Sequence, residues 1–197
     1  MRPRKNSWPE ELDKKETNIL VKIRNMFFEQ FKKIKVVVLD VDGVLTNGLV
    51  LVTEQGEQLR SFHVRDGYAI QQALKAGVPV VVISGGDSQG VLSRMQYLGV
   101  QHVFLGVKDK VTVLMQWLEE YGFQAGDVLF IGDDLPDLPL MKRVGLAACP
   151  SDAVEAVKTA AHYISNRRGG DGVVREVLEK TLTLQNRWTQ AEIIPSI

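Results

Sequence analysis

Three short aliphatic runs decide what kind of sheet this chain can form. Residues 36–39, 80–83 and 128–131 read Val-Val-Val-Leu, Val-Val-Val-Ile and Val-Leu-Phe-Ile. None alternates apolar and polar residues, as a strand with one face in water would. Continuous apolar runs of this length are typical of strands buried on both faces, and such strands belong to parallel sheets covered by helices. The chain is therefore expected to be an α/β protein with a mostly parallel sheet.

Helical segments alternate with the expected strands along most of the chain. We expect strands at 36–40, 78–83, 100–104, 128–131, 144–148 and 162–164. We expect helices at 68–75, 88–98, 109–121, 137–143, 152–160 and 173–184, three of which stop at Gly77, Gly99 and Gly122. This alternation predicts an open three-layer α/β sheet with right-handed crossovers.

One insertion interrupts the alternation after the first strand. Residues 49–52 and 58–62 are strand-like segments that flank Glu54-Gln55-Gly56-Glu57. Two such segments around a short polar turn with a glycine predict a β-hairpin within about 47–62.

Both ends of the chain are expected to lie outside the main domain. Residues 1–33 combine a basic, solvated lead with apolar residues at roughly helical spacing. This predicts an amphipathic helical extension, packed on the core or on a neighbouring subunit. Residues 34–184 are expected to form the α/β domain, and residues 185–197 a C-terminal tail. The tail contains Trp188 and either reaches a neighbouring subunit's site or frays.

The composition excludes several classes of function. The chain has 197 residues and is 45% hydrophobic, so one core can bury roughly 70% of the surface that the unfolded chain exposes. Lys and Arg total 24 and Asp and Glu total 24, so no net field attracts nucleic acid or an anionic membrane. The single Cys149 excludes an intramolecular disulfide, and no signal peptide or long apolar segment is recognisable. We therefore expect a cytoplasmic protein.

Polar residues follow the expected strands at their carboxyl ends. In chain order they are Asp40 and Asp42, Ser84 with Gly85 and Gly86, Lys108 and Lys110, and Asp133, Asp134 and Asp137. Ligands of open α/β sheets bind at this edge. A carboxylate there can attack phosphorus, carboxylates can hold Mg²⁺, Ser and glycine N–H groups can bind phosphate oxygens, and a Lys can neutralise charge. The set predicts a phosphate-handling site.

Taken singly, the same residues have ordinary structural roles. Asp40 and Asp42 could cap a turn, and Asp134 and Asp137 could cap the following helix. Ser84-Gly85-Gly86 could be a simple strand-to-helix turn, and an isolated Lys is usually solvated. Their joint occurrence in this order favours the functional interpretation.

The chain resembles the haloacid dehalogenase superfamily of phosphohydrolases over about residues 34–184. The shared motifs are Leu39-Asp40-Val41-Asp42-Gly43-Val44, Ile83-Ser84-Gly85, Lys110 and Gly132-Asp133-Asp134-Leu135-Pro136-Asp137. Two further segments resemble the small branch that contains the 3-deoxy-D-manno-octulosonate (KDO) 8-phosphate phosphatases. They are Phe62-His63-Val64-Arg65-Asp66-Gly67-Tyr68 and Gly169-Gly170-Asp171-Gly172-Val173-Val174-Arg175-Glu176. The resemblance implies a Rossmann-like fold without a cap domain.

The resemblance also implies a mechanism. Asp40 would be the nucleophile and form an aspartyl phosphate, and Asp42 would be the general acid and base. Mg²⁺ would be held by Asp40, Asp42 through its backbone oxygen, and Asp133. Ser84 and Lys110 would hold the phosphate, with Asp134 and Asp137 supporting the site.

The implied substrate is the phosphate monoester of a 2-keto-3-deoxy sugar acid, such as KDO 8-phosphate in lipopolysaccharide precursor synthesis. Residues expected to bind it are His63, Arg65, Asp66, Gly67, Ser84, Gly85, Arg94 and Lys110. Gly86 stands where the family has Arg, and Arg94, Arg167 and Arg168 are candidates to replace that cation. The departure leaves a nine-carbon sugar acid 9-phosphate open as the alternative.

Members of this branch are homotetramers, in which the hairpin and segments of a neighbouring subunit close the pocket. The resemblance therefore implies the same assembly here. Two interpretations of another class are a receiver-type phosphoacceptor domain and a non-catalytic oligomerisation domain. The first fits poorly because it lacks a carboxylate cluster as late as Asp133, and the second because every catalytic carboxylate is present.

Overall fold

The structure is a computed structural model, and it describes residues 28–188. Most of the expected N-terminal extension, and residues 189–197 of the expected tail, lie outside the described residues. Residues 28–33 are helical, and Phe31 in this segment is fully buried in the core. The division into an extension, a domain and a tail stays a prediction.

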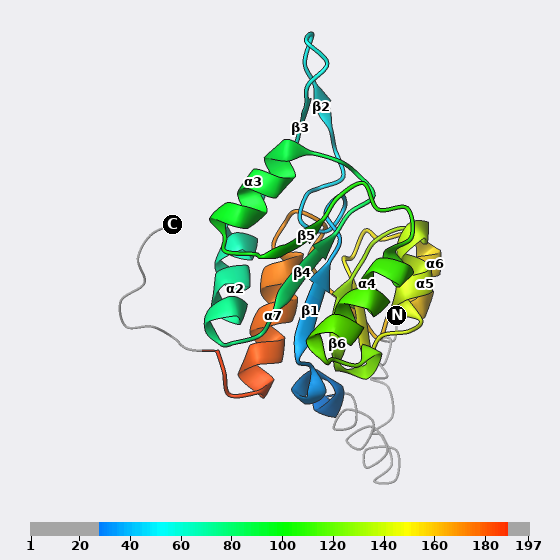
Figure 1. Cartoon of the computed structure of the whole chain (residues 1–197). Coiled ribbons are helices and arrows are strands. Elements are labelled where there is room, and N and C mark those ends of the chain that lie inside the picture. The colour runs from blue at the N-terminus through cyan, green and yellow to red at the C-terminus, as the bar shows by residue number, and fades with distance from the viewer. Residues whose placement is uncertain (1–27, 189–197) are drawn as a thin grey trace, which may run out of the picture.

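A six-stranded parallel sheet forms the centre of the molecule, in the order β5-β4-β1-β6-β7-β8 (Figure 1). Its strands are β1 (Val36–Leu39), β4 (Val80–Ile83), β5 (His102–Phe104), β6 (Val128–Ile131), β7 (Leu146–Cys149) and β8 (Tyr163–Ile164). Every residue of β1, β4 and β6 is buried, as strands covered on both faces require. The predicted α/β fold is confirmed.

Helices cover both faces of the sheet (Figure 1). One layer consists of α2 (Val64–Lys75), α3 (Gln89–Tyr97) and α7 (Val173–Leu184). The other consists of α4 (Lys110–Tyr121), α5 (Leu138–Met141) and α6 (Glu155–Ala160). Successive residues of β1 point to opposite sides, so Val37 and Leu39 pack under the first layer while Val36 and Val38 pack under the second.

The order of the strands places a crevice at one edge of the sheet. From β1 the chain first builds β4 and β5 on one side, and it then crosses to build β6, β7 and β8 on the other. The loops after β1, β4 and β6 therefore diverge at the carboxyl ends of three neighbouring strands, where open α/β sheets bind ligands. No further domain covers this edge within residues 28–188.

The predicted hairpin projects from this edge of the molecule (Figure 1). Its strands are β2 (Leu51–Val52) and β3 (Gln58–Leu59), which pair antiparallel and are shorter than expected. All four of these residues are exposed. The rest of the subunit therefore does not cover the strands of the hairpin.

The expected helices at 68–75 and 137–143 differ from those in the structure. Helix α2 begins at Val64 rather than near residue 68, because the His63 side chain caps it by accepting a hydrogen bond from the Arg65 N–H. Gly67 lies inside α2, where a Cβ would come 2.7 Å from Arg94 Nη2 on α3. The expected helix 137–143 is a 3₁₀ turn (Leu135–Asp137) followed by the single turn of α5.

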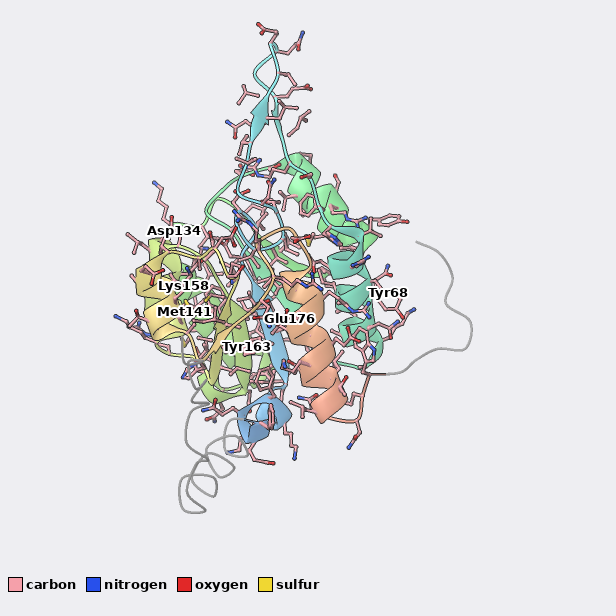
Figure 2. The ribbon with its side chains drawn as sticks, turned by 180° about the vertical axis from the view of Figure 1, so that it is seen from behind. Tyr68, Asp134, Met141, Lys158, Tyr163 and Glu176 are labelled. Carbon is pink, nitrogen blue, oxygen red and sulfur yellow. The ribbon has the colours of Figure 1, made fainter. Side chains whose placement is uncertain are left out.

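The last strand is fastened to the last helix on the back of the molecule (Figure 2). The Tyr163 hydroxyl of β8 donates a 2.5 Å hydrogen bond to Glu176 Oε1 of α7, and the Lys180 ammonium lies 5.2 Å from the centre of the Tyr163 ring. No helix in residues 28–188 is both long and apolar enough to span a membrane.

Candidate active site

Three carboxylates from separate segments meet at the carboxyl edge of the sheet. Asp40 follows β1, Asp133 follows β6 by two residues, and Asp137 ends the 3₁₀ turn after it. Each offers one oxygen, and these oxygens all lie within 4.8 Å of one another. Asp137 is also tied to its own loop, because its Oδ2 accepts the Asp133 N–H at 2.9 Å. The arrangement concentrates negative charge at one point.

Lys110 provides the positive charge inside this cluster. It is the first residue of α4, which Asp109 caps by accepting the N–H groups of Val111 and Thr112. Its buried Nζ lies 2.8 Å from Asp40 Oδ1 and 2.7 Å from Asp137 Oδ1. Although burial works against its charge, the two carboxylates raise the pKa of Lys110. Lys110 is therefore a permanent cation that fixes Asp40 and Asp137.

One ammonium does not balance three carboxylates. Burial, followed by the charge of Asp137, raises the pKa of Asp40 to about 6. Burial, followed by the charges of Asp40 and Asp137, raises the pKa of Asp133 to about 7. A hard divalent cation that prefers oxygen ligands would relieve this repulsion. The donor set fits Mg²⁺.

The turn after β1 brings Asp133 close to the backbone. Gly43 has a φ of +82°, and a Cβ at this position would lie 2.0 Å from Asp133 Oδ2. Only glycine adopts this conformation readily and leaves the space. The Asp40-Val41-Asp42-Gly43 turn can therefore approach the Asp133 carboxylate.

The Asp42 side chain points to a different partner. Its two oxygens accept hydrogen bonds from Arg60, Nε to Oδ1 at 2.7 Å and Nη2 to Oδ2 at 3.2 Å. Asp42 is not a member of the carboxylate cluster, although it lines the same pocket. The two acids of the turn are thus separated, with Asp40 held by Lys110 and Asp42 held by Arg60.

The carboxylates line a pocket of about 340 Å³. Its opposite wall includes Ser84, Gly85 and Gly86 from the loop after β4, together with Lys108. The Ser84 hydroxyl accepts the Gly86 N–H at 3.1 Å. Asp134 is exposed and also lines the pocket, and it caps the 3₁₀ turn by accepting the Leu135 N–H at 2.8 Å. Small groups and cations on this wall suit the binding of a phosphate.

Several residues expected to bind substrate do not line this pocket. His63 caps α2, and Gly67 lies against Arg94 and Leu98 of α3. Asp66 is 1% exposed, and its Oδ1 accepts the N–H of Arg175 at 2.6 Å in the first turn of α7. Arg65 is exposed at the start of α2. Arg94 lines a separate groove of about 610 Å³ between the hairpin and α3.

Sequence reasoning missed Arg60 and the role of Gly169 and Gly170. Arg60 belongs to no recognisable motif, because it is a single charged residue in a polar segment. Gly170 donates its N–H to the Val44 oxygen at 2.9 Å, and a Cβ on Gly169 would lie 1.9 Å from the Gly43 oxygen. The paired glycines were a usable signal, because adjacent glycines often mark a close approach of two backbones.

Comparison with known proteins places the chain in a family. Residues 106–177 match the family model of haloacid dehalogenase-like hydrolases. The 3-deoxy-D-manno-octulosonate 8-phosphate phosphatase KdsC of Salmonella typhi is 35% identical over 176 residues, which are 89% of each chain. The KdsC of Escherichia coli K12 is 37% identical over 161 residues, 82% of this chain and 86% of that protein.

Solved structures of the same family have a similar fold. The KDO 8-phosphate phosphatase of Moraxella catarrhalis, in complex with magnesium, phosphate and KDO, has a TM-score of 0.80 and 33% identity, covering 82% of this chain and 93% of the other. A putative hydrolase of the superfamily from Legionella pneumophila has a TM-score of 0.83 and 38% identity, covering 87% and 93%.

The fold and the carboxylate site are those of a phosphatase built on the haloacid dehalogenase-like fold. The chain belongs to the family of these KdsC phosphatases.

Proposed function

We propose that the protein is a Mg²⁺-dependent phosphatase that releases phosphate from a 2-keto-3-deoxy sugar acid phosphate, with KDO 8-phosphate as the first candidate. The carboxylate cluster around Lys110 carries this proposal, because it combines a cation site, a nucleophile and a phosphate-sized pocket. The KdsC relatives, and the Moraxella catarrhalis structure with magnesium, phosphate and KDO, support the choice of metal and substrate.

Mg²⁺ would be held by the carboxylates of Asp40 and Asp133 and by the backbone oxygen of Asp42, with Asp137 supporting the cluster. Bound there, it offsets the charge of the substrate phosphate. Its positive charge also favours the ionised form of Asp40, whose pKa stands at about 6 without it.

Asp40 is the proposed nucleophile. Its carboxylate attacks phosphorus, the bond to the sugar oxygen breaks, and water then cleaves the aspartyl phosphate. Lys110 holds Asp40 in place at 2.8 Å and, with Ser84, binds the phosphate oxygens. Asp42 protonates the leaving sugar oxygen and then takes a proton from the attacking water.

The sugar would extend from the pocket into the groove between the hairpin and α3. Arg94 lines this groove. His63, Arg65, Asp66 and Gly67 lie at the start of α2, outside the lining of the pocket. Arg167 and Arg168 are exposed, and Arg168 pairs with Asp152 at 3.2 Å.

The homotetramer is part of the proposal. The hairpin exposes large apolar side chains, including Leu49 at 71%, Leu51 at 67% and Val52 at 62%. A two-stranded hairpin is marginally stable alone, and contiguous exposed apolar surface marks interaction sites. Neighbouring subunits would cover these residues and close the pocket, which lacks a cap. Trp188, the last described residue, packs on Tyr68 and Arg175 of its own subunit.

A nine-carbon sugar acid 9-phosphate is the second candidate substrate, because Gly86 leaves the pocket wall without a cationic side chain at that position. A receiver-type role is disfavoured by membership of the phosphatase family.

The test is a phosphate-release assay with Mg²⁺ that compares KDO 8-phosphate, a nine-carbon sugar acid 9-phosphate and p-nitrophenyl phosphate. We expect kcat/KM to be highest for KDO 8-phosphate and the Asp40→Asn variant to be inactive. Hydrolysis of the aryl ester alone would refute the sugar acid substrate but leave the phosphatase intact. Full turnover by Asp40→Asn would refute the mechanism.

A further inference from the structure

Arg60 is a charged residue without an assigned role, and it pairs with Asp42 of the reactive pocket. It follows β3 on the returning arm of the hairpin, and its side chain is only 8% exposed. Its guanidinium makes two hydrogen bonds to the two oxygens of Asp42, at 2.7 and 3.2 Å. Two parallel charge-assisted bonds of this kind are the strongest and most directional pairing of a guanidinium with a carboxylate.

Arg60 stands where the pocket and the groove meet. It lines the groove of about 610 Å³, while its partner Asp42 lines the pocket of about 340 Å³. Gly86 adjoins both residues, since a Cβ there would lie 3.3 Å from Asp42 Oδ2 and 3.5 Å from Arg60 Nη2. A side chain at position 86 would crowd the pair. A substrate with its phosphate in the pocket and its sugar in the groove would pass this point.

The ion pair of Arg60 with Asp42 conflicts with the role of Asp42 as general acid and base. Both carboxylate oxygens of Asp42 are occupied by Arg60, whereas a general acid and base must direct one oxygen at the sugar oxygen or at water. The guanidinium stays charged at any working pH, so it cannot release Asp42 by losing a proton. The pair must therefore open during turnover, and a buried Arg60 then needs another anion.

We propose that Arg60 is a specificity-determining residue that exchanges Asp42 for the carboxylate of the sugar acid when the substrate enters the groove. This inference rests on the proposed function. The substrate carboxylate is chemically equivalent to the Asp42 side chain, so the guanidinium keeps two bonds in either state. A phosphate ester without an acid group offers Arg60 no second carboxylate, so nothing compensates for opening the pair.

The experiment compares wild type, Arg60→Ala and Arg60→Lys on KDO 8-phosphate and on p-nitrophenyl phosphate, with saturating Mg²⁺. A second readout is the inhibition constant of free KDO against hydrolysis of the aryl ester, which measures recognition of the acid without a phosphate. The matched control is Arg187→Ala, which removes an arginine that hydrogen bonds to the Ala76 oxygen at the opposite edge of the sheet. Thermal unfolding of each variant verifies folding.

For Arg60→Ala we expect kcat/KM on KDO 8-phosphate to fall about 10- to 100-fold and the inhibition constant of KDO to rise by a similar factor. The aryl ester should change less than about threefold, because it has no carboxylate for Arg60 to bind. Arg60→Lys should be intermediate, since it keeps the charge and loses the second bond. Arg187→Ala should match wild type.

An equal loss on both substrates, or no loss on either, would overturn the role of Arg60. An unchanged inhibition constant for KDO would overturn it as well. Failure of the wild-type enzyme on every sugar acid phosphate would instead count against the proposed function, so the two failures are distinguished by the wild-type data alone.

Discussion

The backbone of Gly169 lies against the backbone of Gly43, so closely that a Cβ on Gly169 would be 1.9 Å from the Gly43 oxygen. The next residue, Gly170, donates its N–H to the Val44 oxygen at 2.9 Å. These two residues form a brace behind the turn that carries Asp40 and Asp42.

We predict that Gly169→Ala lowers kcat, although residue 169 does not contact the substrate. The added methyl group would push the turn forward, and a displacement of about 1 Å in an active site can lower the rate about 10²-fold. We expect kcat to fall by about that factor. The measurement is steady-state kinetics with KDO 8-phosphate. Gly126→Ala is the matched control, because a Cβ there has open space, and a similar loss in that variant would contradict the argument.

The raised carboxyl pKa values predict how the stability of the metal-free protein depends on pH. The pKa values of Asp40 and Asp133, about 6 and about 7, lie above the ordinary value of 3.8. Between these pH values the folded state holds protons that the unfolded state has lost. The contribution of the two carboxyls to the free energy of unfolding therefore declines as pH rises from about 4 to about 7. We expect the Tm without metal to be lower at pH 8 than at pH 5. Mg²⁺ should restore it at pH 8, and a metal-free Tm that rises over this range would refute the prediction.

Asp133→Asn should separate stability from activity. Removing one of the three carboxylates relieves repulsion in the metal-free protein, so its Tm at pH 8 should rise. The same change removes a proposed Mg²⁺ ligand, so we expect a higher Mg²⁺ requirement and at least about a 10²-fold loss of kcat/KM. Calorimetry and Mg²⁺ titration of activity measure the two effects. A variant with lower Tm and unchanged Mg²⁺ requirement would show that the cluster is not a metal site.

Asp66→Ala distinguishes a structural role from a substrate-binding one. Asp66 is buried and accepts the Arg175 N–H in the first turn of α7. We expect a loss of about 1–2 kcal/mol in the free energy of unfolding, as for other helix caps. KM for the sugar acid phosphate should stay unchanged at temperatures where the variant is folded. Denaturant unfolding and kinetics decide the matter, and a raised KM with normal stability would assign Asp66 to the substrate instead.

A charge placed on the exposed hairpin is expected to break the proposed tetramer. Leu51→Asp places a carboxylate at a position that is exposed in the subunit and would be covered in the tetramer. We expect sedimentation to show dissociation to smaller species with reduced activity. The control is Gln55→Asp, which adds the same charge at the turn of the hairpin. A variant that sediments like wild type would place the interface elsewhere.

The sheet was predictable because the residues that specify each strand are adjacent in the sequence. The runs at β1, β4 and β6 are apolar without alternation, and each is followed by the polar residues that define the edge. The meeting of Asp40, Lys110 and Asp133 followed from the same rule, because parallel strands end on one side. The start of α2 was missed because it depends on the cap that His63 forms, and the packing of Arg94 against Gly67 is a tertiary contact.

Long-range pairing explains the remaining failures. Arg60 reaches Asp42 only because the hairpin folds back over the edge, and neither residue type nor spacing reveals that geometry. Asp66 accepts a backbone N–H of α7, far along the chain, and no local pattern indicates this contact. Such contacts depend on how the layers pack rather than on a local pattern.

The brace also links the turn that carries the nucleophile to a segment far along the chain. The turn that carries the nucleophile is made early in synthesis, but the glycines that support it from behind come only just before α7. The same late segment leads into α7, whose Val173, Val177 and Leu178 are buried in the core. Support for the turn that carries Asp42 and the packing of α7 on the sheet therefore depend on one stretch of the chain.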